Sequence, residues 1–129
     1  MRELTFLEAI REAQEQEMAR DPRVFILGED VSFNVYGSTG GLAARFGQGR
    51  VRDTPISEAG FAGVAVGAAL VGMRPIVDFT IASFMYLAMD PLVSMAAKTA
   101  YMYGGQAHVP AGVRAALFYN RGPPPQHPD

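Results

Sequence analysis

The sequence predicts one α/β domain in which helices cover both faces of a mainly parallel, doubly wound sheet. The chain has 129 residues, which is the length of a single domain. Short apolar runs alternate along it with helical patterns, an order typical of β-α-β units. Its 14 Gly and 9 Pro are spread along the chain rather than gathered in a linker, so they separate many short elements.

The composition excludes several classes of protein. Eleven Lys and Arg against thirteen Asp and Glu, with no run of like charges, predict neither a nucleic-acid surface nor a lipid surface. The absence of Cys excludes disulfides, thiolate metal sites and a Cys nucleophile. The N-terminus is charged, and the most apolar run, residues 61–73, is shorter than the ~20 residues of a membrane helix. We expect a soluble protein of the cytoplasm, or of the mitochondrial matrix in a eukaryote.

The first half of the chain predicts two helices and two strands. Thr5 and Glu8 form a capping box for a helix that ends at Asp21-Pro22. Residues 24–27 are a continuous apolar run, as in a strand that is buried on both faces of a parallel sheet. A Gly-rich connection follows, and then a short helix over residues 42–46 and a brief strand over 51–53.

The second half begins with a helix rich in Ala and Gly, from about Glu58 to Leu70. Each of its three Gly weakens it by ~1 kcal/mol relative to Ala. We therefore expect close packing against another helix or a flat ligand, with burial on most sides. A strand over 74–80, a helix with Asp90 as N-cap that ends at Gly104-Gly105, and a strand over 110–119 complete the pattern.

Ligands of parallel sheets bind at the carboxyl ends of the strands, and two glutamates lie at such ends. Glu58 is the stronger candidate, because a carboxyl flanked by Ile56 and Phe61 is desolvated and can hold a proton at pH 7. The alternative is an exposed first-turn glutamate that the helix dipole stabilises. Glu29, with Asp30, either hydrogen-bonds a ligand or caps the next turn.

Other residues give weaker indications. His108 and His127 have no acidic neighbours at a metal-ligand spacing, so we expect no metal site. The Gly-rich residues 36–41 lack the Lys of a P-loop and the spacing of a dinucleotide fingerprint. Three aromatic residues near one strand end either form a stacking platform or fill the core: Phe79, Phe84 and Tyr86.

Several blocks of the chain, in order, closely resemble the beta subunit of thiamine-diphosphate-dependent 2-oxo acid dehydrogenases of the pyruvate or branched-chain type. The most specific block is Asp-Thr-Pro-Ile-Ser-Glu-Ala-Gly-Phe-Ala-Gly-Val-Ala-Val-Gly-Ala-Ala, residues 53–69. Shorter blocks are Gly28-Glu-Asp-Val31, Phe46-Gly47 with Arg50-Val51, Gly72-Met-Arg-Pro75, Asp90 with Ala96-Ala-Lys98, and Gly104-Gly105. The resemblance implies a transketolase-like pyrimidine-binding domain over residues 1–121. The prolines of residues 122–129 predict an irregular tail.

The resemblance also implies a mechanism. Glu58 matches the glutamate that activates the cofactor, Phe84 matches an aromatic residue beside the aminopyrimidine, and Glu29 lies at a strand end on the cofactor side. Glu58 would hold a proton at the pyrimidine ring and favour the imino tautomer that generates the reactive carbanion. The implied reaction decarboxylates a 2-oxo acid and transfers the acyl group to the lipoyl group of the acyltransferase component. Implied partners are an alpha subunit, which holds magnesium and the diphosphate, and a second beta subunit.

The chain also departs from this family. Family members are more than twice as long and continue, after the position of Gly122, with a catalytic His and a second α/β domain. Gln126-His127 comes too early, among prolines, for that role to be assigned to His127. The Gly-Asp-Gly pattern for magnesium and diphosphate is also absent, so we expect the isolated chain to be inactive. Two alternatives are a transketolase-like ketol transferase domain and a non-catalytic, truncated interaction module.

Overall fold

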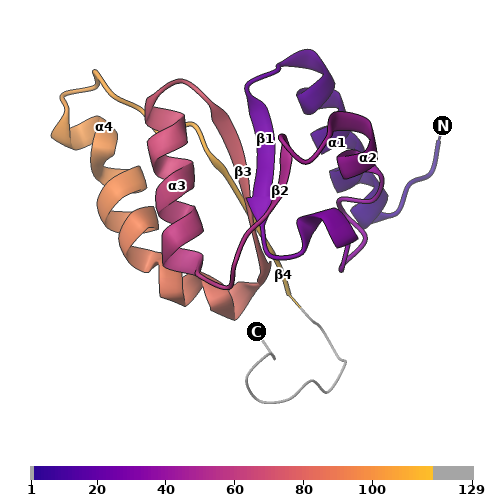
Figure 1. Ribbon diagram of the computed structural model, residues 1–129. Helices are drawn as coiled ribbons and strands as arrows, with labels where there is room; N and C mark the ends of the chain where they lie inside the picture. Colours follow the sequence, from indigo (N-terminus) through magenta and orange to yellow (C-terminus); the bar gives the residue numbers. More distant parts are fainter. Residues whose placement is uncertain (1, 118–129) are drawn as a thin grey trace.

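A computed structural model describes residues 2–117, and it confirms the predicted α/β class (Figure 1). Four parallel strands form one sheet in the order β2-β1-β3-β4. The strands are β1 (Val24–Gly28), β2 (Val51–Asp53), β3 (Arg74–Ile81) and β4 (Gly112–Ala116). The predicted tail, residues 122–129, and the end of the predicted last strand lie outside the described residues.

Helices cover both faces of the sheet, as predicted for a doubly wound fold. The helices α1 (Phe6–Arg20) and α2 (Leu42–Phe46) lie on one face, and α3 (Glu58–Leu70) and α4 (Lys98–Met102) lie on the other (Figure 1). Alternate residues of β1 point to opposite faces, because side chains in a strand alternate. Phe25 and Leu27 therefore join the core under α3, whereas Val24 and Ile26 join the core under α1. In the described part of the chain, no helix has the length and apolarity that membrane crossing needs.

The predicted bounds of α1 and α3 are confirmed. Thr5 and Glu8 form the predicted capping box, in which the Thr5 N–H donates to Glu8 Oε2 at 2.8 Å and the Glu8 N–H donates to Thr5 Oγ1 at 3.3 Å. Helix α3 begins at Glu58 and ends at Leu70. The start of α1 is therefore fixed by a local cap, whereas Ser57 makes no side-chain cap at the start of α3.

The predicted N-cap at Asp90 is wrong. Helical backbone already begins in the 3₁₀ segment η2 (Ala82–Ala88) and continues through the π-helix η3 (Asp90–Ala97) into α4. Met89, which precedes Asp90, has helical backbone angles, and no side chain caps η3. Asp90 therefore lies inside a continuing helical path rather than at a free helix end. Pro91 has no N–H to donate to the preceding turn, which favours a local change in the hydrogen-bond spacing.

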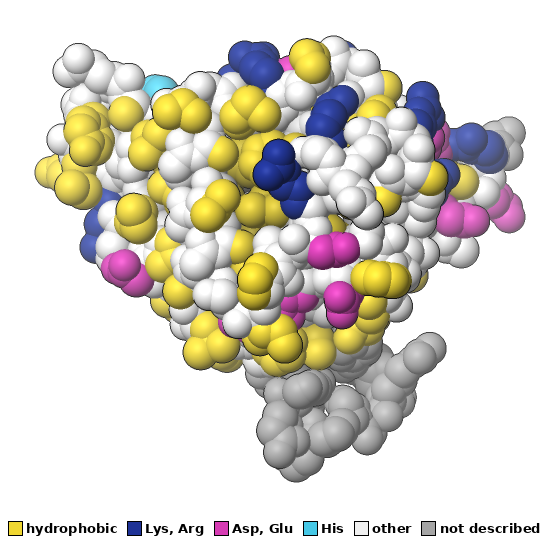
Figure 2. All heavy atoms as spheres, viewed as in Figure 1, with side chains coloured by type: hydrophobic (Ala, Val, Ile, Leu, Met, Phe, Trp, Pro, Cys, Tyr) yellow, Lys and Arg dark blue, Asp and Glu magenta, His cyan; other side chains and the backbone are white. Residues whose placement is uncertain are grey.

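The predicted burial of α3 on most sides is also wrong for this chain. One face is buried, through Phe61, Ala62, Ala65, Val66 and Ala69, whereas the opposite face, which carries Val64 and Gly67, is exposed. A Cβ at Gly63 or Gly67 would meet no atom within 4 Å. Close packing within this chain therefore does not require these glycines. Figure 2 shows that hydrophobic side chains gather at the surface of the half formed by α3 and α4.

Candidate functional site

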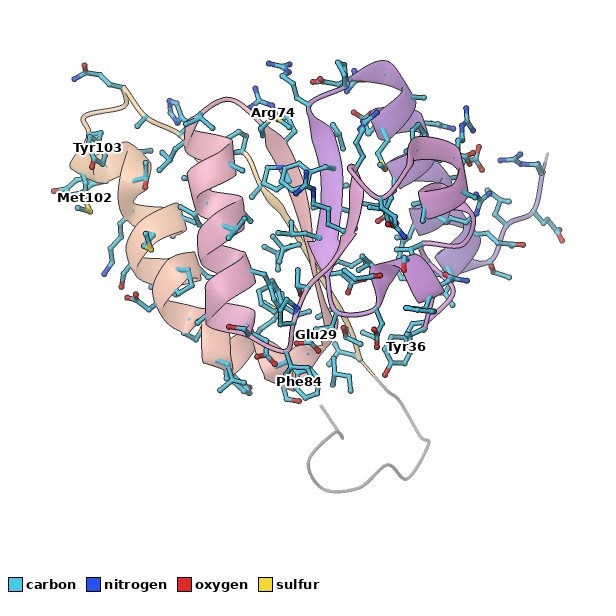
Figure 3. The ribbon with its side chains drawn as sticks, viewed as in Figure 1. Glu29, Tyr36, Arg74, Phe84, Met102 and Tyr103 are labelled. Carbon is cyan, nitrogen blue, oxygen red and sulfur yellow. The ribbon has the colours of Figure 1, made fainter. Side chains whose placement is uncertain are left out.

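The predicted segments meet at the carboxyl edge of the sheet. The Thr54 N–H donates to the Gly28 carbonyl at 3.0 Å, and Thr80 Oγ1 donates to the Glu29 carbonyl at 3.5 Å. Figure 3 shows Glu29 and Phe84 together at this edge, opposite the end that carries Arg74. The parallel direction of all four strands produces this clustering, because their carboxyl ends coincide.

Glu58 lies at this edge as the first residue of α3, and it is buried there. Only 5% of the residue is exposed. The alternative of a water-exposed glutamate at the helix terminus is therefore excluded. A buried carboxyl is costly to the fold unless it is protonated, paired or bound to a ligand, so this position is typical of a functional residue.

Glu29 lies close enough to Glu58 for the two carboxyls to interact. Burial raises the pKa of Glu29, and the negative charges of Glu58 and Asp30 raise it further. Among the described residues, the buried Oε1 atom of Glu29 has no hydrogen-bond partner. Asp30 makes no side-chain cap at the following segment, η1 (Val31–Phe33). Among the described residues, Glu29 Oε1 therefore caps no turn, and its role toward a ligand stays a prediction.

The three aromatic residues have different surroundings, so they do not form one platform. Phe79 is fully buried and packs against Phe61, with ring centroids 5.2 Å apart, so it fills the core. Tyr86 is 71% exposed. Phe84, in η2, is half-buried at the edge beside Glu29 (Figure 3). Of the three, Phe84 alone combines partial burial with a position at the candidate site.

Polar atoms without partners mark the same edge. Within residues 2–117, Thr54 Oγ1 and Ser83 Oγ are buried without a hydrogen-bond partner, as is Glu29 Oε1. These atoms belong to the three segments that contain or adjoin Glu58, Phe84 and Glu29. A flat heteroaromatic ring with polar atoms at its edge would satisfy such groups and would offer a face to Phe84. The residues present therefore fit an aminopyrimidine.

The candidate residues lie near one another, but this chain does not enclose them in one cavity. A cavity of about 400 Å³ adjoins the edge and includes Thr54, Ser57 and Phe61 in its lining, but not Glu29, Glu58 or Phe84. Within residues 2–117, no three His, Cys, Asp or Glu side chains gather as a metal site. His108 is exposed, and His127 lies outside the described residues.

A bulge at the end of β3 is a feature that sequence analysis missed. The register between β3 and β4 shifts between Asp78 and Ile81, and Thr80 has a left-handed φ of 65°. This backbone is strained for a β-branched residue, and the Asp78 carboxylate holds it by accepting the Thr80 N–H at 2.9 Å. The bulge connects β3 to η2, which carries Phe84. The sequence signal was an Asp within the otherwise apolar residues 75–79.

The fold and this site correspond to a known class of domain. The chain belongs to the family of transketolase pyrimidine-binding domains, which matches residues 2–128.

Named relatives make the class more specific. The chain is 52% identical over 110 residues to the pyruvate dehydrogenase E1 component subunit beta of Rickettsia bellii, a match that covers 84% of this chain and 34% of the relative. It is 43% identical over 127 residues to the mitochondrial pyruvate dehydrogenase E1 component subunit beta of Bos taurus. This match covers 97% of this chain and 35% of the relative. The pyruvate dehydrogenase E1 component subunit beta of Rhizobium meliloti is 48% identical over 112 residues, a match that covers 85% of this chain and 24% of the relative. The resemblance to dehydrogenase beta subunits is confirmed, although the chain spans only about a third of the length of most of these relatives.

Proposed function

We propose that this chain is the pyrimidine-binding part of the beta subunit of a thiamine-diphosphate-dependent 2-oxo acid dehydrogenase. The observation that carries the proposal is the buried carboxyl of Glu58 at the sheet edge, beside Glu29 and Phe84. The names of the relatives favour pyruvate over a branched-chain 2-oxo acid, and a dehydrogenase over a ketol transferase.

Each candidate residue has a distinct role in this proposal. When bound, thiamine diphosphate supplies the electron sink that allows a 2-oxo acid to lose carbon dioxide. Glu58 holds a proton at a ring nitrogen of the aminopyrimidine, and its burial keeps water from competing for that proton. The half-buried ring of Phe84 offers an apolar face. The unpartnered Oε1 of Glu29 accepts a polar hydrogen at the edge of the ring.

The proposal requires other protein components. An alpha subunit would hold the diphosphate and magnesium, and a second beta subunit and the lipoyl acyltransferase component would complete the reaction sequence. The exposed apolar face of α3 supports assembly, because a surface of this kind is typical of a subunit contact. The isolated chain is expected to be inactive. We place the complex in the bacterial cytoplasm or the mitochondrial matrix, since both bacterial and mitochondrial relatives are known.

The substitution Glu58→Gln tests the proposal in a full-length beta subunit that contains this domain and is assembled with its alpha subunit. Gln keeps the volume of the side chain but cannot transfer the carboxyl proton. Turnover of pyruvate and exchange of the thiazolium proton into heavy water should both slow by about 10²- to 10⁴-fold. Cofactor affinity should change little, because Gln retains hydrogen-bonding atoms.

Glu3→Gln is the matched control, because Glu3 is exposed and precedes α1, outside the segments that form the sheet edge. It should leave both rates unchanged. Equal exchange rates in the Glu58→Gln variant and the unmodified complex would remove Glu58 from the mechanism. A complex that assembles but shows no turnover even with Glu58 intact would instead indicate the non-catalytic interaction module.

A further inference from the structure

A second cavity, of about 300 Å³, lies on the α1 side of the sheet, where β3 and β4 end. It adjoins the candidate site without including its candidate residues. Thr80, which donates to the Glu29 carbonyl, lines this cavity, whereas Glu29, Glu58 and Phe84 do not. Its walls come from α1, the η1–α2 connection, β3 and β4. The residues that matter for its chemistry are Leu7, Ile10, Ser38, Asp78, Thr80 and Arg114.

The cavity contains a buried ion pair that still has hydrogen-bonding capacity. Arg114 Nη2 donates to Asp78 Oδ2, and both side chains are largely buried, with 20% and 8% exposed. The other carboxylate oxygen of Asp78 accepts the Thr80 N–H at 2.9 Å, so both oxygens of Asp78 have partners. Arg114 Nε is buried and has no partner among the described residues. The cavity therefore offers an unpaired N–H donor at Arg114 Nε, and the Arg114–Asp78 pair as a whole carries no net charge.

Ser38 provides a second polar group without a partner. The residue is 1% exposed, and its Oγ atom has no hydrogen-bond partner within residues 2–117. Its backbone is held in place, because Gln14 Nε2 of α1 donates to the Ser38 carbonyl at 2.7 Å. A buried hydroxyl and a buried guanidinium N–H that both lack partners destabilise the fold unless a bound molecule satisfies them. Their common cavity is thus prepared for a polar ligand.

We propose that this cavity binds a small, uncharged molecule that has an amide-type carbonyl and a short aliphatic chain. The carbonyl oxygen would accept the hydrogen bonds of Arg114 Nε and Ser38 Oγ. The aliphatic chain would contact the apolar walls formed by Leu7 and Ile10.

The ion pair determines that the ligand is uncharged. Arg114 and Asp78 neutralise each other, so a carboxylate or an ammonium group would bring an uncompensated charge into a largely buried space. The volume limits the size of the ligand, because about 300 Å³ lies at the lower end of the range for small-molecule sites. The preferred ligand is therefore smaller than a nucleotide or a typical cofactor.

Saturation-transfer NMR on the full chain tests the proposal with N-ethylacetamide as the probe. Butyrate and butylammonium are charged comparison probes of similar size. We expect saturable binding of the amide at millimolar concentration and at least about tenfold weaker binding of either ion. The measurement does not depend on dehydrogenase activity. Amide binding can therefore be absent while the proposed function is correct, and it can be present while the proposed function is wrong.

Two variants locate the binding. Ser38→Ala should weaken amide binding about tenfold without lowering the melting temperature, because the hydroxyl has no partner in the free chain. Ala116→Val places two more methyl groups on a wall of the cavity and should abolish amide binding. This second variant tests the location independently of Ser38→Ala. The control is Ser94→Ala, at an exposed position in η3. Absence of saturable amide binding, equal binding of butyrate, or unchanged binding in both cavity variants would overturn the proposal.

Discussion

Gly28 lies where β1 and β3 approach too closely for any side chain, so Gly28→Ala should destabilise the domain strongly. A Cβ at Gly28 would lie 2.2 Å from the Asp78 carbonyl oxygen, whereas ordinary van der Waals contact begins at 3.4 Å. The two strands would have to separate by about 1 Å at this point. The contact is with backbone rather than with a flexible side chain, so the cost should reach roughly 3 kcal/mol, the upper part of the range for overpacking.

Thermal unfolding followed by circular dichroism measures this cost. A loss of roughly 3 kcal/mol should lower the melting temperature of a domain of this size by roughly 10 °C. Gly49→Ala is the matched control, because a Cβ at Gly49 would meet no atom within 4 Å. Its free energy of unfolding should stay within roughly 0.5 kcal/mol of the original. Equal melting temperatures for the two variants would refute the close approach of β1 and β3.

Two further predictions concern Glu29 and α3. The raised pKa of Glu29 means that the folded chain holds a proton there more tightly than the unfolded chain, whose ordinary value is 4.5. Stability from this group is therefore fully present below pH 4.5 and is lost as the pH rises through the raised value. Glu29→Gln should flatten that part of the pH profile of urea unfolding, and a profile that matches that of Glu3→Gln would contradict the burial of Glu29. Gly67→Ala should stabilise the chain by up to about 1 kcal/mol in the same assay, because the added methyl group meets no atom within 4 Å. A destabilised variant would show that other atoms contact this face of α3 in solution.

The sequence by itself determined the local elements and the location of the candidate site. The capping box at Thr5 depends on residues close together in the chain, so local chemistry suffices to predict it. The bounds of α3 were predicted from its length and its Ala content. Glu29, Glu58 and Phe84 could be placed at one edge because alternating strands and helices imply a parallel sheet. The burial of Glu58 was predicted from Ile56 and Phe61, but only Phe61 is itself buried, whereas Ile56 is 84% exposed.

Contacts between distant segments decided the rest. The left-handed backbone of Thr80 is held by Asp78, and Asp78 pairs with Arg114, which lies on another strand. Pairing of this kind leaves no periodic signal in the sequence. Asp90 has the local signature of an N-cap, but the preceding helical segment removes the free helix end that a cap requires. One face of α3 is exposed because the folded chain supplies neighbours only on the other side, and composition records how apolar a helix is but not which elements pack against it.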